Sequence, residues 1–250
     1  MKRIISLALI LIMVFTFAAC TKPAQSTTTT TTTTTPNDAD TTTKSEGVMT
    51  WAEYMAAELK TKVTIEAYVQ GHQSWWDNKV TIYAQDGDGG YFLYEIPCTE
   101  EMAAKLVSGT KIRVTGYKAE YAGEIEIMTD ALDPATIEII DGHYIASPVD
   151  VTSKLGTEEM ADYQNMKVLF KGMTVKELSY KQSDYDKDIY LTLTYNGTDY
   201  SFCVENYLTG PDSDVYKAVA ALKVGDVVDI EAFLYWWNGI NPHITGVTVK

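Results

Sequence analysis

Residues 106–123 read LVSGTKIRVTGYKAEYAG, and residues 222–239 read LKVGDVVDIEAFLYWWNG. Each stretch has a leucine, a glycine three residues later and a β-branched residue three further on. Alternating apolar residues then lead to an aromatic residue and a glycine turn. Two copies of one pattern, separated by about the length of a small domain, predict that one structural unit occurs twice in the chain.

The sequence around both stretches has the same order of predicted elements. Period-2 alternation predicts three strands before each stretch, then a short helix, then two strands. In the first unit the strands are expected at 63–69, 80–84, 92–96, 112–116 and 125–128, with the helix at 99–106. In the second unit they are expected at 168–172, 189–193, 200–204, 228–232 and 244–249, with the helix at 214–222. Further helices are predicted at 51–59, from the capping-box spacing of Thr50 and Glu53, and at 158–164.

Three strands, a helix and two strands in roughly 100 residues resemble the OB-fold, a five-stranded Greek-key barrel. The chain is also similar to the tandem OB-type domains of uncharacterised, clostridia-like bacterial surface lipoproteins. The predicted fold is therefore mainly β. Two tandem five-stranded OB-type barrels, at residues 48–147 and 148–250, each carry a short helix between strands 3 and 4.

The N-terminal residues have the features of a lipoprotein signal peptide. Lys2 and Arg3 precede an uncharged apolar run at 4–17, and two alanines precede Cys20. We expect cleavage after residue 19, acylation of Cys20 and a disordered Thr-rich linker at 20–47. This arrangement predicts a lipid-anchored protein on the extracytoplasmic face of the cell membrane, in a one-membrane or a two-membrane envelope.

Composition narrows the partners and the chemistry. The net charge is −14, and loss of Lys2 and Arg3 would make it more negative, so nucleic acid is disfavoured and neutral or cationic ligands are favoured. No metal motif, cofactor fingerprint or catalytic constellation is present, and Asp86–Gly90 is interpreted as a hairpin turn rather than a calcium loop. Whether Cys98 and Cys203 form a disulfide between the two units is left open.

Aromatic residues mark the candidate ligand-binding site. OB-folds bind ligands on the outer face of strands 2 and 3, between the 1–2 and 4–5 loops. Strand alternation predicts that Tyr83 and Tyr91 point outward on that face. The remaining candidates lie in the loops at its edges: Trp75, Trp76, Asp77 and Tyr121 in the first unit, with Tyr185, Trp236 and Trp237 in the second. Capping of the barrels, or packing of one against the other, is an equally strong interpretation of these aromatics.

The resulting prediction is a non-enzymatic, membrane-anchored binding protein. Its ligand is expected to be a glycan, or another small neutral or cationic molecule. A protein–protein interaction scaffold and a single-stranded nucleic-acid binder are the alternatives, and a hydrolase comes last. A basic stripe would favour nucleic acid, an aromatic trough with polar edges a glycan, and a flat apolar patch a protein. Two adjacent buried carboxylates in a cleft would favour an enzyme.

Overall fold

The computed structural model describes residues 44–184 and 187–250. The predicted signal peptide, Cys20 and most of the Thr-rich linker lie outside the described residues, as does Tyr185. No helix in the described part of the chain has the length and apolar character needed to cross a membrane. All of the described residues fall in one compact unit of the chain.

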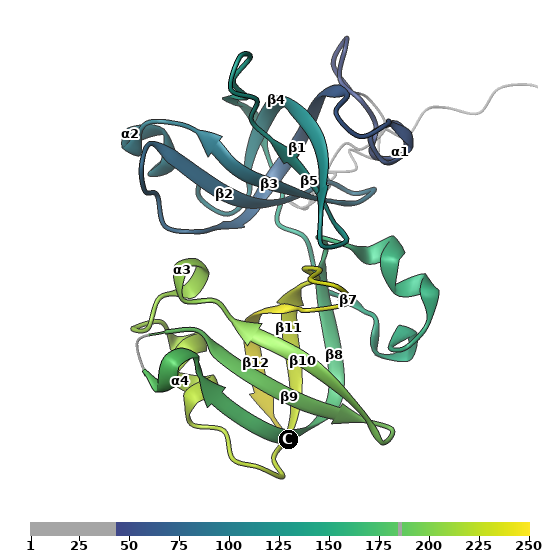
Figure 1. Cartoon of the computed structure of the whole chain (residues 1–250), viewed down its shortest axis with the longest axis vertical. Coiled ribbons are helices and arrows are strands. Elements are labelled where there is room, and N and C mark those ends of the chain that lie inside the picture. Colours follow the sequence, from purple (N-terminus) through teal and green to yellow (C-terminus); the bar gives the residue numbers. More distant parts are fainter. Residues whose placement is uncertain (1–43, 185–186) are drawn as a thin grey trace, which may run out of the picture. The chain divides into compact units, whose positions relative to one another are not determined.

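Barrel 1 is formed by the first repeat unit (Figure 1). Its sheet has the order β1-β2-β3-β5-β4-β6, and pairing of β1 with β4 closes it. The pairing of β3 with β5 is parallel and the other pairings are antiparallel. The strands are β1 (Lys62–His72), β2 (Lys79–Gln85), β3 (Gly90–Pro97), β4 (Thr110–Tyr121), β5 (Glu124–Met128) and β6 (Thr136–His143).

Barrel 2 repeats this topology. Its order is β11-β12-β10-β9-β8-β7, closed by β11 and β8, so β8 to β12 take the places of β1 to β5. Both units are therefore OB-type Greek-key barrels in tandem, as predicted. The strands are β7 (Val149–Asp150), β8 (Lys167–Tyr180), β9 (Ile189–Tyr195), β10 (Thr198–Val204), β11 (Val227–Phe233) and β12 (His243–Val249).

Short helices complete both barrels. In α1 (Trp51–Ala56), Thr50 and Glu53 form the predicted capping box. Helix α2 (Glu100–Ala103) lies between β3 and β4, and α3 (Asn206–Thr209) and α4 (Asp214–Ala220) lie between β10 and β11. The helix predicted at 158–164 is instead the 3-10 helix η2 (Glu158–Tyr163); the other 3-10 helices are η1 (Thr152–Lys154) and η3 (Lys181–Ser183).

Each barrel encloses its own hydrophobic core. The core of barrel 1 is built on alternating residues of β1, β2 and β4, and that of barrel 2 on the equivalent residues of β8, β9 and β11. A third, smaller cluster lies outside both barrels and consists of Tyr83, Phe92 and Phe233. This third cluster joins the two barrels, because it combines side chains of β2 and β3 with one of β11.

Strand β3 departs from the predicted alternation. Val80 pairs with Ile96 but Ile82 pairs with Leu93, so β3 contains one extra residue at this point. Glu95 takes a positive φ of 49° there, as expected for a β-bulge. The bulge reverses the faces of the residues before it, which corrects our prediction for Tyr91. Its side chain is fully buried in the core of barrel 1, 5.3 Å from the ring of Tyr54.

Candidate ligand-binding site between the barrels

Barrel 2 covers part of the outer face that β2 and β3 present in barrel 1. The ring of Phe233 stacks on that of Tyr83 at 4.4 Å, with 13° between their planes. The ring of Tyr235 lies 5.2 Å from that of Phe92. Tyr83 points outward from its strand, as alternation predicts, but its side chain is fully buried. The expectation that Tyr83 belongs to an exposed aromatic patch is therefore wrong, because barrel packing hides it.

Hydrogen bonds seal the contact around these rings. Gln85 Oε1 accepts from the backbone N–H of Lys167 at 2.8 Å, and Gln164 Nε2 donates to the carbonyl of Gly123 at 2.8 Å. Glu124 Oε2 accepts from the backbone N–H of Trp236 at 2.8 Å. Buried polar groups need such partners, so these bonds fix how the two barrels meet.

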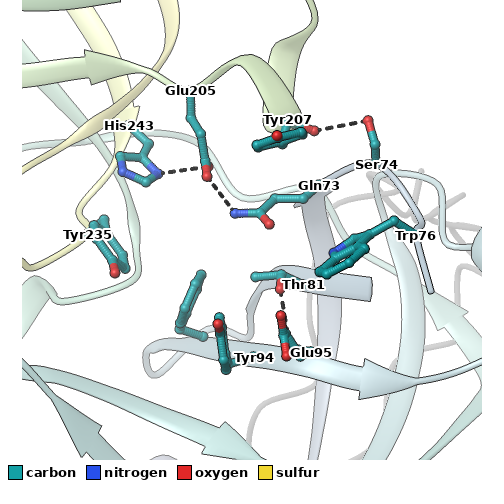
Figure 2. Close-up of a pocket in the computed structure, with 11 residues that line it drawn as sticks. Gln73, Ser74, Trp76, Thr81, Tyr94, Glu95, Glu205, Tyr207, Tyr235 and His243 are labelled. Carbon is teal, nitrogen blue, oxygen red and sulfur yellow. Dashed lines mark hydrogen bonds and ion pairs between the residues drawn. The ribbon is translucent and has the colours of Figure 1, made fainter. Parts of the chain in front are cut away.

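The uncovered part of the same face forms a cavity of about 490 Å³. Figure 2 shows side chains of both barrels around it. Five of the lining residues are aromatic: Trp76, Phe92, Tyr94, Tyr207 and Tyr235. The polar lining residues are Gln73, Ser74, Thr81, Glu95, Glu205 and His243. This size lies within the range of about 300–1,000 Å³ that small-molecule sites occupy.

Glu205 is the central polar group on the barrel 2 side of the cavity. Its Oε1 accepts from Gln73 Nε2 at 2.7 Å, and its Oε2 lies 3.2 Å from His243 Nδ1. His243 Nδ1 also lies 2.7 Å from the Tyr83 hydroxyl, with which it shares a hydrogen bond. Glu205 Oε2 is buried beside His243 Nδ1, which the carboxylate shares with the Tyr83 hydroxyl.

The opposite edge of the cavity already holds an ammonium group. Lys79 Nζ lies 2.9 Å from Glu95 Oε2 and 4.3 Å from the centre of the Trp76 ring. The backbone N–H of Ser74 donates to the carbonyl of Tyr207 at 2.7 Å, which joins the β1–β2 loop to α3. The loop that carries Trp76 is therefore fixed to barrel 2, and Trp76 itself stays 57% exposed.

The other predicted site residues have different surroundings. Trp75 is half-buried and its Nε1 donates to the carbonyl of Cys98 at 3.0 Å, so it supports the loop. Asp77 is an exposed turn residue with a φ of 47°. Trp236 is half-buried against the core of barrel 2. Tyr121 and Trp237 pair edge to face at 5.3 Å, away from the cavity lining. Trp76 is thus the candidate that lines this cavity.

Sequence reasoning missed most of the polar lining. Gln73, Glu205, Tyr235 and His243 were not among the predicted site residues. These residues come together only because one barrel packs on the other. Strand periodicity describes each barrel alone, so it contains no signal for that contact. The concentration of aromatics at the strand ends was the only available indication.

Two buried carboxylates lie next to the contact between the barrels. Burial raises the pKa of Glu124 to about 8 and that of Glu126 to about 7. Glu124 precedes Ile125 on β5 and Glu126 follows it, and neither carboxylate lines the cavity. Glu124 holds the backbone of Trp236, which gives it a structural role. These two groups therefore do not form a pair facing a substrate cleft.

The two cysteines and the Asp86 turn were the other groups singled out in the sequence. Cys98 and Cys203 are both free thiols, which answers the open question of a disulfide between the units. Asp86 Oδ1 accepts from the backbone N–H groups of Asp88 and Gly89, which confirms the hairpin-turn interpretation. Among residues 44–184 and 187–250 there is no group of three or more His, Cys, Asp or Glu side chains suited to a metal ion.

No protein-family model and no curated protein matches the chain. Among solved structures, it is similar to the Ifi202 HINa domain in complex with 20bp dsDNA, at 12% identity and a TM-score of 0.34, covering 77% of this chain and 97% of that one. It is also similar to the p204 HINb domain, at 10% identity and a TM-score of 0.33, covering 78% and 100%. A Replication Protein A heterotrimer bound to ssDNA matches at 12% identity and a TM-score of 0.31, covering 76% and 49%. Similarities this weak assign no function to the present chain.

Proposed function

We propose that this chain is a lipid-anchored, extracytoplasmic, non-catalytic binding protein whose inter-barrel cavity takes a small organic cation. The observation that carries the proposal is the Glu205 carboxylate in the lining of a cavity walled by five aromatic rings. The carboxylate and the rings would both stabilise the positive charge of a ligand cation.

The chemistry of the lining favours positive charge. Aromatic faces attract cations by about 0.5–2 kcal/mol each, and more when water is excluded. Glu205 contributes negative potential, whereas Glu95 is already paired with Lys79 at the rim. No lysine or arginine is among the lining residues within the described ranges. The net charge of −14 draws cations toward the protein at longer range.

Lys79 provides an example of the proposed interaction within the protein. Its ammonium group contacts both a carboxylate, Glu95, and an aromatic ring, Trp76. The same two kinds of group, Glu205 with Tyr235 and Tyr207, remain on the barrel 2 side of the cavity. A ligand ammonium could contact a carboxylate and an aromatic ring there, as the Lys79 ammonium does at the rim.

Nucleic acid fits the cavity less well. A phosphate group would meet the Glu205 carboxylate, and the nearby Lys79 is already paired with Glu95. Sugars remain compatible with the aromatic walls of the cavity. A response to single-stranded DNA that weakens steeply with salt would favour the nucleic-acid alternative.

A calorimetric titration of the full chain in detergent micelles with choline tests the cavity. The matched ligand is the uncharged isostere, in which a tert-butyl group replaces the trimethylammonium group. We expect choline to bind and its affinity to fall about tenfold or more, roughly 1.4 kcal/mol, in Glu205→Gln and Trp76→Ala. Trp237→Ala is the control and should bind normally. Equal binding of both ligands, or no binding of choline, would overturn the cation proposal.

The anchor is tested separately by cell fractionation. Cys20→Ser should move the protein from the membrane fraction to the soluble extracytoplasmic fraction, because acylation requires the thiol. Cys98→Ser is the matched control, since Cys98 is a half-buried thiol within barrel 1, and it should stay with the membrane. Retention of the Cys20→Ser variant on membranes would contradict lipid anchoring.

A further inference from the structure

The outer face of barrel 2 has a second hollow that barrel 1 does not cover. Strands β8, β9 and β10 form its floor, and the loop between β11 and β12 forms one edge. Its volume is about 450 Å³, close to that of the inter-barrel cavity. We propose that this hollow is a binding site for a neutral saccharide. This inference does not depend on the proposed cation site.

The floor of the hollow is a row of polar side chains. Thr192 of β9 pairs with Glu177 of β8 on one side and with Ser201 of β10 on the other. All three line the hollow, while the adjacent Leu191 and Phe202 belong to the core beneath. Strand pairing therefore sets hydroxyl and carboxylate groups in one line across three strands, where they can hydrogen-bond to successive sugar hydroxyls.

Two exposed aromatic rings border this row. Tyr190 is 42% exposed at one end and Trp237 is 48% exposed in the β11–β12 loop. Sugar rings present apolar faces that stack on aromatic side chains, as bases do at about 1–3 kcal/mol per base. Both rings lie in the lining of the same hollow as the hydrogen-bonding row.

Trp237 is held in place by barrel 1. Its ring meets that of Tyr121 edge to face at 5.3 Å. The backbone N–H of Asn238 donates to the carbonyl of Ala122 at 2.7 Å, and that of Trp237 donates to the carbonyl of Gly239 at 2.8 Å. A fixed ring loses little conformational freedom when a ligand stacks on it, so it favours binding.

The charge of the hollow selects a neutral ligand. Glu177 is the one ionisable acid among its lining residues, and no lysine, arginine or histidine lines it within the described ranges. A phosphate would lack a cationic partner, and an ammonium group would find one carboxylate without the five-ring wall of the other cavity. Asn238 and Asn241 add amide donors and acceptors, which suit hydroxyl groups.

The test is a calorimetric titration of the full chain in detergent micelles with chitotetraose, cellotetraose and maltotetraose. At least one of them should bind saturably and without salt dependence. Its affinity should fall tenfold or more in Trp237→Ala and should also fall in Ser201→Val, which blocks the floor from within a strand. Trp76→Ala is the matched control and should bind normally, while choline should not compete.

Two outcomes would overturn the saccharide site. Failure of all three tetrasaccharides to bind at millimolar concentration would exclude it. Loss of sugar binding in Trp76→Ala with retention in Trp237→Ala would place the sugar in the inter-barrel cavity instead. The choline titration reports on the other cavity, so failure of one proposal is distinguishable from failure of the other.

Discussion

The two barrels share one strand order, but a side chain of barrel 2 packs on the barrel 1 face, while the equivalent face of barrel 2 is an open hollow. In both, the first strand shifts register against the second, between Val69 and Gly71 in barrel 1 and between Val175 and Glu177 in barrel 2. Beyond the shift, Gly71 pairs with Tyr83, and Glu177 pairs with Thr192. A Cβ at position 71 would lie 3.0 Å from the ring of Phe233.

This difference shows how one fold can offer two kinds of site. Glycine and tyrosine in barrel 1 admit a ring from barrel 2, so part of that face is covered and the rest is aromatic and acidic. Glutamate and threonine at the equivalent places in barrel 2 leave an open, polar floor. The fold locates a possible site, and the residues of the face determine its chemistry.

The largest expected effect on stability comes from Phe233, the barrel 2 ring that covers the face of barrel 1. Phe233→Ala should lower the free energy of unfolding by about 3–5 kcal/mol, because it removes a buried ring that stacks on Tyr83. Denaturant unfolding measures this loss. The control Leu132→Ala removes a side chain that is 96% exposed and should change stability by under about 0.5 kcal/mol. A small effect of Phe233→Ala would contradict the claim that packing of this ring distinguishes the barrel 1 face from the barrel 2 face.

The next effect is a pH dependence of stability at the covered side. The pKa of Glu124 is raised to about 8 by burial, from an ordinary value of 4.5. The folded protein therefore keeps a proton that the unfolded chain loses. This stabilisation is complete below about pH 4.5 and is lost as the pH rises through about 8. The pKa of Glu126, raised to about 7, acts in the same direction.

The free energy of unfolding should accordingly fall by roughly 3–4 kcal/mol from Glu124 alone between about pH 5 and about pH 8. Glu124→Gln should flatten this decline, measured by denaturant unfolding at each pH. Glu158→Gln, at an exposed position, should not change it. A wild-type profile that rises over this range would show that Glu124 is ionised in the folded protein.

A smaller effect is expected from the hydroxyl group that joins the barrels. Tyr83→Phe removes the 2.7 Å hydrogen bond to His243 Nδ1 while keeping the stacked ring. We expect a loss of about 1 kcal/mol in the free energy of unfolding. Tyr117→Phe removes a surface hydroxyl that bonds to Asp133 and should cost less. Equal losses would show that the buried bond contributes no more than a surface bond.

The smallest expected effects on stability come from the two exposed tryptophans. Trp76→Ala and Trp237→Ala should each lower the free energy of unfolding by under about 1 kcal/mol, because both rings are about half exposed or more. Thermal unfolding measures this change. A large loss in either variant would indicate that its ring is mainly structural, which would weaken the corresponding site.

The sequence predicted the barrels better than the site. The capping box at Thr50, the strand order and the hairpin at Asp86 follow from local chemistry that residues close in sequence determine. Tyr91 was misplaced because the extra residue at Glu95 reverses the alternation, and nothing in the composition of β3 signals that bulge. Tyr83 was placed on the correct face, but its burial depends on Phe233, which lies far away in the sequence.

The most direct test is a crossed titration of choline and the bound tetrasaccharide against Trp76→Ala and Trp237→Ala. Two separate sites predict that choline binding is lost only in Trp76→Ala and that saccharide binding is lost only in Trp237→Ala. Loss of both ligands in the same variant, with both retained in the other, would contradict the claim that the two barrel faces have distinct ligands.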